Sequence, residues 1–240
     1  MPLRYTYLLV NLGAILIPLC YSFDPRVNFY KKWRYFIPAA AVVAIFFVAW
    51  DNWFTKQGIW GFNPAYIIGI KLGQLPLEEV LFFFCIPYAC VFLYEVIRYF
   101  KSRTGRVWPV VVSRLLLVLA VVLLVAYRDR MYTAMMAAGL ALALVAVLFI
   151  LKPDYMGYFY VMFLISKVPF MIVNGILTNG LRQYGHGPVV WYQEAGIIGP
   201  RVLGMPVEDM GYSMLLLLLN VVVFEFLRGR STIREGSRNG

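Results

Sequence analysis

The chain has 240 residues, of which 62% are hydrophobic and only 14% are charged, whereas globular domains use about 45–50% apolar and about 25% charged residues. This composition excludes a water-soluble enzyme or binding domain and predicts a chain whose surface faces the lipid bilayer. The net charge of +10 does not indicate nucleic-acid binding here, because basic residues at the ends of membrane helices orient the chain and meet anionic head groups.

Apolar runs of spanning length predict seven transmembrane helices, separated by clusters of Pro, Gly or charged residues. The runs cover residues 3–21, 35–53, 77–98, 109–127, 132–151, 156–174 and 207–228. They leave room for short loops and a tail but for no soluble domain. The sequence therefore predicts an all-α integral membrane protein.

The basic residues indicate how this protein is oriented. The loops that share a side with the C-terminus contain 13 of the 22 Lys and Arg residues, and the opposite loops contain 7. Cytoplasmic loops carry the excess of basic residues. We therefore expect a cell-membrane protein with its N-terminus outside and its C-terminus in the cytoplasm.

A short acidic motif occurs twice. Pro-Leu-Glu-Glu at 76–79 opens the third span, and Pro-Val-Glu-Asp at 206–209 opens the seventh, 130 residues later. Glu95 and Glu225 each follow the proline by 19 residues. Arginines lie close to both of these later acids, which favours structural ion pairs there.

Two polar positions extend this duplication, because Asp51 ends the second span and Asn174 ends the sixth. The pattern predicts two parallel three-helix repeats, spans 1–3 and 5–7, joined by span 4 and related by a pseudo-twofold axis along the membrane normal. The expected segments are a first repeat at 1–107, a linker helix at 108–130, a second repeat at 131–228 and a disordered polar tail at 229–240.

The paired acids are the strongest functional candidates. One acid in the first turn of a helix interacts favourably with the helix dipole, but two adjacent acids in both copies exceed what a cap requires. Ionisable groups at membrane depth are commonly functional. Periodicity places Glu79 and Asp209 on the stripe facing the bundle, with Glu78 and Glu208 about 100° away. The candidate catalytic residues are Glu78, Glu79, Glu208, Asp209, Asp51 and Asn174.

Lys167 is a further unusual residue, because it lies near the middle of the sixth span, where an unpaired ammonium is costly. We expect it to pair with a carboxylate or with a polar group such as Asn220. A structural and a functional role both remain open. Ser213 and Asn220 lie on the same helical stripe as Asp209 and are expected to face the bundle interior.

The sequence carries no motif for redox or metal chemistry. It has no glycine-rich nucleotide motif, and Cys20, Cys85 and Cys90 lack the spacing of a zinc site or of a disulfide framework. It also lacks an aspartate cluster for a magnesium–diphosphate, and its seventh span has no lysine for a retinal Schiff base. We therefore predict no tightly bound cofactor and no metal.

The duplicated Pro-x-Glu-(Glu/Asp) motif on two three-helix units resembles the carotenoid lycopene cyclase domain family, the membrane-integral and flavin-independent type. The likeness covers about residues 3–228 and matches the fused form that carries both halves in one chain. It implies a lycopene β-cyclase, an intramolecular lyase or isomerase that converts the ψ-ends of lycopene into β-ionone rings, giving γ-carotene and then β-carotene. It also implies association with other enzymes of the carotenoid pathway.

The implied reaction is a redox-neutral isomerisation. An acid protonates the terminal double bond, the neighbouring double bond attacks the carbocation, and a base removes a ring proton. Adjacent carboxylates in a low dielectric favour one neutral donor and one ionised acceptor, and aromatic faces stabilise a cation by about 0.5–2 kcal/mol. The expected substrate-binding residues are Trp50, Trp53, Phe82, Phe83, Tyr212, Ser213, Asn220 and Lys167.

Other functions also fit the sequence. The duplicated acids and Lys167 would serve as an ion path in a non-catalytic transporter or carotenoid-binding protein, and a cyclase of C50 carotenoids would use the same motif. The copies differ, with Asp51 against Asn174 and Glu79 against Asp209. This asymmetry favours one composite cavity, so that neutralising a motif acid in either half is expected to abolish cyclisation of both lycopene ends.

Overall fold

The computed structural model describes residues 3–101, 105, 107–179 and 187–236. Within this part of the chain, seven helices are long and apolar enough to cross a membrane. They are α1 Thr6–Tyr21, α2 Trp33–Lys56, α3 Leu77–Phe100, α4 Val107–Ala126, α5 Met131–Val145, α6 Met156–Thr178 and α7 Glu208–Gly236. The expectation of an all-α membrane protein with seven spans is confirmed.

Three short helical segments extend these helices. The segment η1 (Leu3–Tyr5) leads into α1, and η2 (Phe29–Lys32) leads into α2. The segment η4 (Ala146–Leu151) continues α5 in π-helical geometry. Continuous helix is the expected solution in lipid, because each backbone N–H and C=O then has a partner within its own segment.

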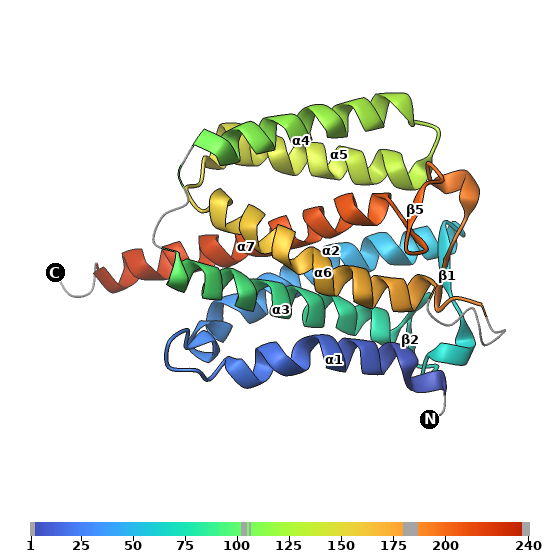
Figure 1. Cartoon of the computed structure of the whole chain (residues 1–240), viewed down its shortest axis with the longest axis horizontal. Helices are drawn as coiled ribbons and strands as arrows, with labels where there is room; N and C mark the ends of the chain where they lie inside the picture. Colours follow the sequence, from blue (N-terminus) through green and yellow to red (C-terminus); the bar gives the residue numbers. More distant parts are fainter. Residues whose placement is uncertain (1–2, 102–104, 106, 180–186, 237–240) are drawn as a thin grey trace.

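Helices α3 and α7 occupy the centre of the bundle. Helix α3 packs against α1, α2 and α6, while α7 packs against α2 and α5. Helix α4 packs mainly against α5, and the two lie at one edge of the bundle with α1 at the opposite edge (Figure 1). The largest hydrophobic cluster joins side chains of α2, α3, α5, α6 and α7.

The loops before α3 and α7 contain matching short elements at one end of the bundle. The first loop contains β1 Trp60–Phe62, η3 Pro64–Tyr66, β2 Lys71–Leu72 and β3 Leu75–Pro76. The second contains β4 Val190–Tyr192, η6 Glu194–Gly196, β5 Arg201–Val202 and β6 Met205–Pro206. Each element of the second loop begins 130 residues after its counterpart. In each loop the last two strands form an antiparallel hairpin.

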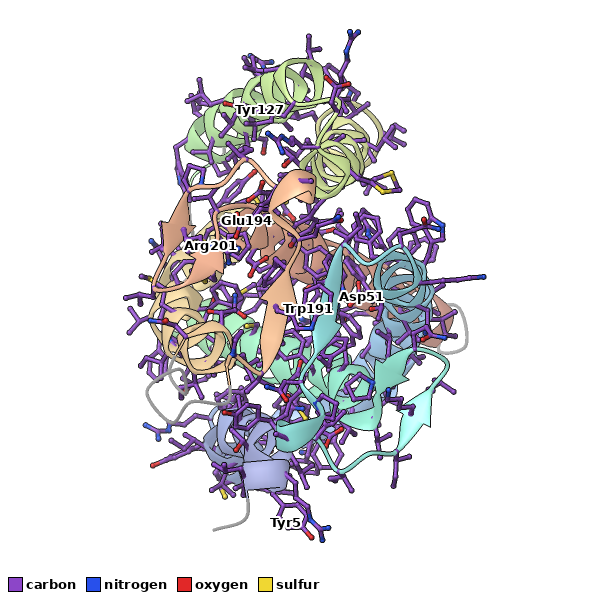
Figure 2. The ribbon with its side chains drawn as sticks, turned by 90° about the vertical axis from the view of Figure 1, so that its right-hand side faces the viewer. Tyr5, Asp51, Tyr127, Trp191, Glu194 and Arg201 are labelled. Atoms are coloured by element: carbon purple, nitrogen blue, oxygen red, sulfur yellow. The ribbon has the colours of Figure 1, made fainter. Side chains whose placement is uncertain are left out.

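The two loops are joined to each other by β1 and β4, which pair antiparallel with Gly61 opposite Trp191. A Cβ atom on Gly61 would lie 2.3 Å from Cζ2 of Trp191, so a larger residue does not fit there. Figure 2 looks onto this end of the molecule, where the paired strands cross the middle of the bundle. The loops thus cover one end of the bundle as a single layer.

Ion pairs connect α3 and α7 at the other end. Glu95 of α3 contacts Lys32 and accepts a hydrogen bond from Arg228 of α7 at 2.9 Å. Arg98 of α3 contacts Glu225 of α7. Each of the two helices therefore supplies an arginine to the other helix's glutamate, as the positions of the acids near arginines suggested.

The segment 229–240, which is expected to form a polar tail, begins within the last helix. Helix α7 continues to Gly236, well beyond the predicted end of the span at residue 228. Helical hydrogen bonding continues beyond the apolar segment because nothing in Arg228–Gly236 breaks the helix before its end. Residues 237–240 lie outside the described part of the chain.

Candidate active site

An apolar cavity near the loop end of the bundle contains three carboxylates from three helices. Asp51 comes from the last turns of α2, Glu79 from the first turn of α3 and Asp209 from the first turn of α7. Pro76 is the N-cap of α3, with extended backbone, and Leu77 begins the helix. This geometry places Glu79 one turn into the bundle. All three carboxylates are buried.

Tyrosine hydroxyls donate to each of these carboxylates. Tyr7 of α1 donates to Glu79 at 2.5 Å, and Tyr212 of α7 donates to Asp51 at 2.6 Å. Glu79 and Asp51 thus each accept a hydrogen bond from one phenol. The phenol that donates to Asp51 comes from α7, on the other side of α4 in the chain.

Asp209 is held more extensively than the other two acids. Tyr132 of α5 donates to it at 2.8 Å, Asn174 of α6 at 2.7 Å and Tyr192 of β4 at 3.0 Å. Burial raises the pKa of Tyr192 well above its usual range, and the neighbouring Asp209 carboxylate raises it further. Tyr192 therefore stays protonated and remains a donor.

These carboxylates are not neutralised by neighbouring cations. Within the described residues, the ion pairs of the structure involve neither Asp51, Glu79 nor Asp209. Three buried acids with no paired cation cannot all be ionised at low cost, because burial and like charges both oppose ionisation. The arrangement therefore favours a mixture of protonated and ionised carboxyl groups, which an acid–base site requires.

The second acid of each motif points away from this cavity and into its own loop. Glu78 accepts a hydrogen bond from the backbone N–H of Ile68 at 2.6 Å, and Glu208 accepts the same bond from Ile198 at 2.6 Å. Thr133 also donates to Glu208 at 2.6 Å. These two acids thus hold the loops against the helix starts.

The remainder of the cavity is aromatic near the acids and mixed farther into the bundle. The aromatic side chains near the acids are Trp60, Phe62, Phe82, Tyr132, Tyr192 and Tyr212. Lys167 lies deeper, where its ammonium donates to Ser213 at 2.8 Å. The ammonium also lies 3.8 Å from the ring centroid of Phe163 and 4.1 Å from that of Phe170. Its partners are thus a hydroxyl and two rings rather than a carboxylate or Asn220.

The structure brings eight of the candidate residues to this cavity and places six elsewhere. Those that line it are Asp51, Glu79, Phe82, Lys167, Asn174, Asp209, Tyr212 and Ser213. Those outside its lining are Glu78, Glu208, Trp50, Trp53, Phe83 and Asn220.

Physical reasons for the other placements are visible in the packing. Trp50 packs edge-on against Tyr212 from outside the cavity, and Trp53 is 40% exposed. Phe83 is fully buried against Phe47 in the core. The Asn220 Nδ2 donates to the Leu216 carbonyl of its own helix at 2.9 Å, whereas its buried Oδ1 has no hydrogen-bond partner among the described residues.

Three tyrosines that donate hydrogen bonds to these acids were not among the sequence candidates, namely Tyr7, Tyr132 and Tyr192, and neither was Trp60, which lines the cavity. Tyr7 and Tyr132 are the second residues of α1 and α5. The equivalent positions of these two tyrosines, each at the start of the first helix of a proposed repeat, could have identified them from the sequence. Aromatic residues at the ends of spans are usually assigned to the interfacial belt, and this general explanation concealed their hydrogen bonds to the acids.

The described residues contain no group of three or more His, Cys, Asp or Glu side chains arranged to hold a metal ion. The fold and the cavity define a membrane protein with a buried site in which acids, phenols and aromatic faces surround an apolar space.

Comparison with known proteins identifies the family. A family model described as lycopene cyclase matches residues 4–97 and 129–227, and the chain belongs to this family. The gap between the two matched regions contains the whole of α4.

Curated relatives share part of this chain. A bifunctional lycopene cyclase/phytoene synthase of Gibberella fujikuroi is 24% identical over 50% of this chain and 20% of its own length. Proteins of the same description from Pyrenophora tritici-repentis and Phaeosphaeria nodorum are 34% and 36% identical, over 38% and 35% of this chain and 16% and 14% of their own lengths. The chain thus matches a fifth or less of these relatives. No solved structure matches it significantly.

Proposed function

We propose that this protein is a lycopene β-cyclase that converts the ψ-ends of lycopene into β-ionone rings by acid–base catalysis. The observation that carries the proposal is the convergence of Asp51, Glu79 and Asp209 on one apolar cavity. Family membership supports the substrate class. The relatives named above also carry phytoene synthase in their descriptions, which supports association with other carotenoid-pathway enzymes.

The reaction needs two proton transfers and no change of oxidation state. A protonated carboxyl group adds its proton to the terminal double bond of the substrate, which leaves a tertiary carbocation. The neighbouring double bond attacks this carbon, forms the ring bond and moves the positive charge into the ring. An ionised carboxylate then removes a ring proton, and the electrons of that C–H bond form the ring double bond. Substrate and product are isomers.

We assign the base to Asp209 and the acid to the pair Asp51 and Glu79. Three hydrogen-bond donors converge on Asp209, and donated hydrogen bonds stabilise a carboxylate in its ionised form. Asp51 and Glu79 each accept one such bond. The faces of Trp60, Phe82 and Tyr212 line the same space, and each aromatic face contributes about 0.5–2 kcal/mol to a nearby cation.

We also propose that the chain consists of two three-helix repeats on either side of α4, with the N-terminus outside and the C-terminus in the cytoplasm. The 130-residue offset between matching loop elements supports the repeat, as does the match of the family model to two regions. The larger number of basic residues on the side of the C-terminus supports the orientation.

The deciding experiment is expression in a bacterial host that accumulates lycopene. A change from red to orange, with γ-carotene and β-carotene on chromatography, is the expected result. The Asp209→Asn variant, expressed to the same level in the membrane, should leave lycopene unchanged. Unaltered lycopene in cells that contain intact wild-type protein would overturn the proposal. A host that makes C50 carotenoids tests that alternative substrate in parallel.

A further inference from the structure

Helix α1 packs against α3, and its inward face is less completely covered in its middle than at its two ends. Tyr7, Asn11, Ala14 and Pro18 lie on one face of this helix, at the spacing of successive turns. Tyr7 and Asn11 are almost completely buried, whereas Ala14 and Pro18 are only half-buried. The inward face of α1 is therefore only partly covered about two turns below Tyr7.

The cavity extends to this partly covered face. Ala14 lines it from α1, and Pro169, Phe170 and Val173 line it from α6. Pro169 is at the same time exposed on the outer surface of α6. The cavity is not fully enclosed, and its lining includes Ala14 of α1 together with this outward-facing residue of α6, which places its opening between α1 and α6.

This opening lies at membrane depth. Ala14 is seven residues below Tyr7, or about 10 Å along the helix axis, and it lies within the span Leu3–Tyr21. The surrounding outer surface is apolar, since Ile17, Val168 and Ile172 are 66%, 67% and 60% exposed. Lipid chains, rather than water, contact such a surface.

We propose that the opening between α1 and α6 is the entrance through which the hydrocarbon end of the substrate passes from the bilayer to the three carboxylates. The proposal rests on the proposed function for the identity of the occupant, a long apolar polyene. A forty-carbon chain is far longer than the roughly 10 Å along α1 between Ala14 and Tyr7, whose hydroxyl donates to Glu79. Its remaining length therefore lies in the bilayer, across Ala14 and Phe170, while one end reacts.

Filling the entrance provides the first test. Ala14→Phe places a ring in the opening, and Gly13→Phe, one position around the same helix, is its matched control because nothing lies within 4 Å of a Cβ there. We expect Ala14→Phe to raise KM for lycopene in liposomes about tenfold or more with a smaller effect on kcat, and Gly13→Phe to behave like the wild type. Equal KM values for both variants would overturn the entrance.

A reversible block separates entry from misfolding. Ala14→Cys and Gly13→Cys, each combined with Cys20→Ser, are compared before and after reaction with a benzyl methanethiosulfonate, and again after reduction with dithiothreitol. Modification should slow only the Ala14→Cys protein, and reduction should restore its rate. The Gly13→Cys protein also reports any effect of modifying the native Cys85 and Cys90.

Pigment binding distinguishes failure of the entrance from failure of the proposed reaction. Lycopene retained by the purified protein is measured by its absorbance, without reference to turnover. Modified Ala14→Cys that binds as much lycopene as the unmodified protein would contradict the entrance. Ala14→Cys protein that binds lycopene before modification, loses binding after it and yet forms no ring in either state, like the wild type, would instead contradict the cyclase proposal and leave the entrance supported.

Discussion

The hydroxyl of Tyr212 on α7 donates a hydrogen bond to Asp51 on α2, although the two residues are 161 positions apart in the chain. Asp51 belongs to the first half and Tyr212 to the second. Both line the same cavity as Glu79 and Asp209. The two halves therefore contribute to one space, and two separate sites would not need such a contact.

One shared cavity predicts that a single substitution abolishes cyclisation of both lycopene ends. Glu79→Gln and Asp209→Asn should each lower the rate about 10²–10⁴-fold, the usual contribution of a general acid or base. Product analysis should show lycopene without accumulation of the one-ringed intermediate. Asp24→Asn, on an exposed turn far from the cavity, is the control. A variant that kept roughly half of the normal rate would instead favour two autonomous sites.

The structure separates the roles of the two acids in each motif, which yields a second prediction. Glu208→Gln keeps an oxygen that accepts from Ile198 and Thr133, whereas Glu208→Ala removes it. We expect Glu208→Gln to stay folded and active, and Glu208→Ala to lose about 1–3 kcal/mol of stability because buried donors are left without a partner. Glu78→Gln and Glu78→Ala should differ in the same way.

Thermal unfolding in detergent and cyclisation rates check this second prediction together. If Glu208→Gln unfolded at the wild-type temperature yet lost activity as severely as Asp209→Asn, Glu208 would belong to the chemistry, as the duplicated motif alone suggests. A matched loss of stability and activity in the alanine variant would instead confirm its role in anchoring the loop.

The ion pairs at the far end predict an effect on stability without a direct effect on chemistry. The Glu95 side chain is 2% exposed, while those of Lys32 and Arg228 are 24% and 33% exposed. Glu95→Gln should destabilise the protein by about 1–3 kcal/mol, because it removes the charge that the basic side chains contact. The loss is smaller than for a fully buried ion pair, because solvent reaches Lys32 and Arg228. Thermal unfolding is the measurement. Asp24→Asn should leave the unfolding temperature unchanged, since Arg26 is largely exposed.

Independence from redox cofactors is the fourth prediction, because lycopene and its cyclised products are isomers. Purified protein in liposomes should cyclise lycopene without added flavin or nicotinamide. The measurement compares product formed with and without reduced flavin under anaerobic conditions. Strict dependence on reduced flavin would contradict this prediction and would indicate a flavin-binding site, formed by helices and loops, that has no recognisable sequence motif.

The sequence predicts the spans and part of the site for identifiable reasons. The spans follow from the length of uninterrupted apolar runs, and α2 extends beyond its predicted 35–53 because Trp33 and Lys56 continue the helix into the interface. Glu79 and Asp209 stand out because acids are rare at membrane depth, and the helical period places them on the inward face.

Other parts of the site depend on contacts that no local pattern encodes. Tyr192 reaches Asp209 only because β1 and β4 pair across the two halves. Phe83 and Asn220 lie on the same helical stripes as residues that line the cavity. Phe83 instead packs against Phe47 in the core, and Asn220 donates a hydrogen bond within α7. Periodicity assigns a face to a residue, whereas packing decides whether that face borders a cavity or the solid core.

The exchanged ion pairs also bear on how such a protein is assembled. Arg98 of α3 contacts Glu225 of α7, and Arg228 of α7 contacts Glu95 of α3. Each half carries one acid and one arginine at equivalent positions, but each arginine reaches the acid of the other half. Two copies of a single half, docked around the same axis, would complete the same exchange with no covalent link. A chain severed in the loop after α3 would likewise keep all of these contacts between its fragments, so co-expressed fragments are expected to reassemble in the membrane.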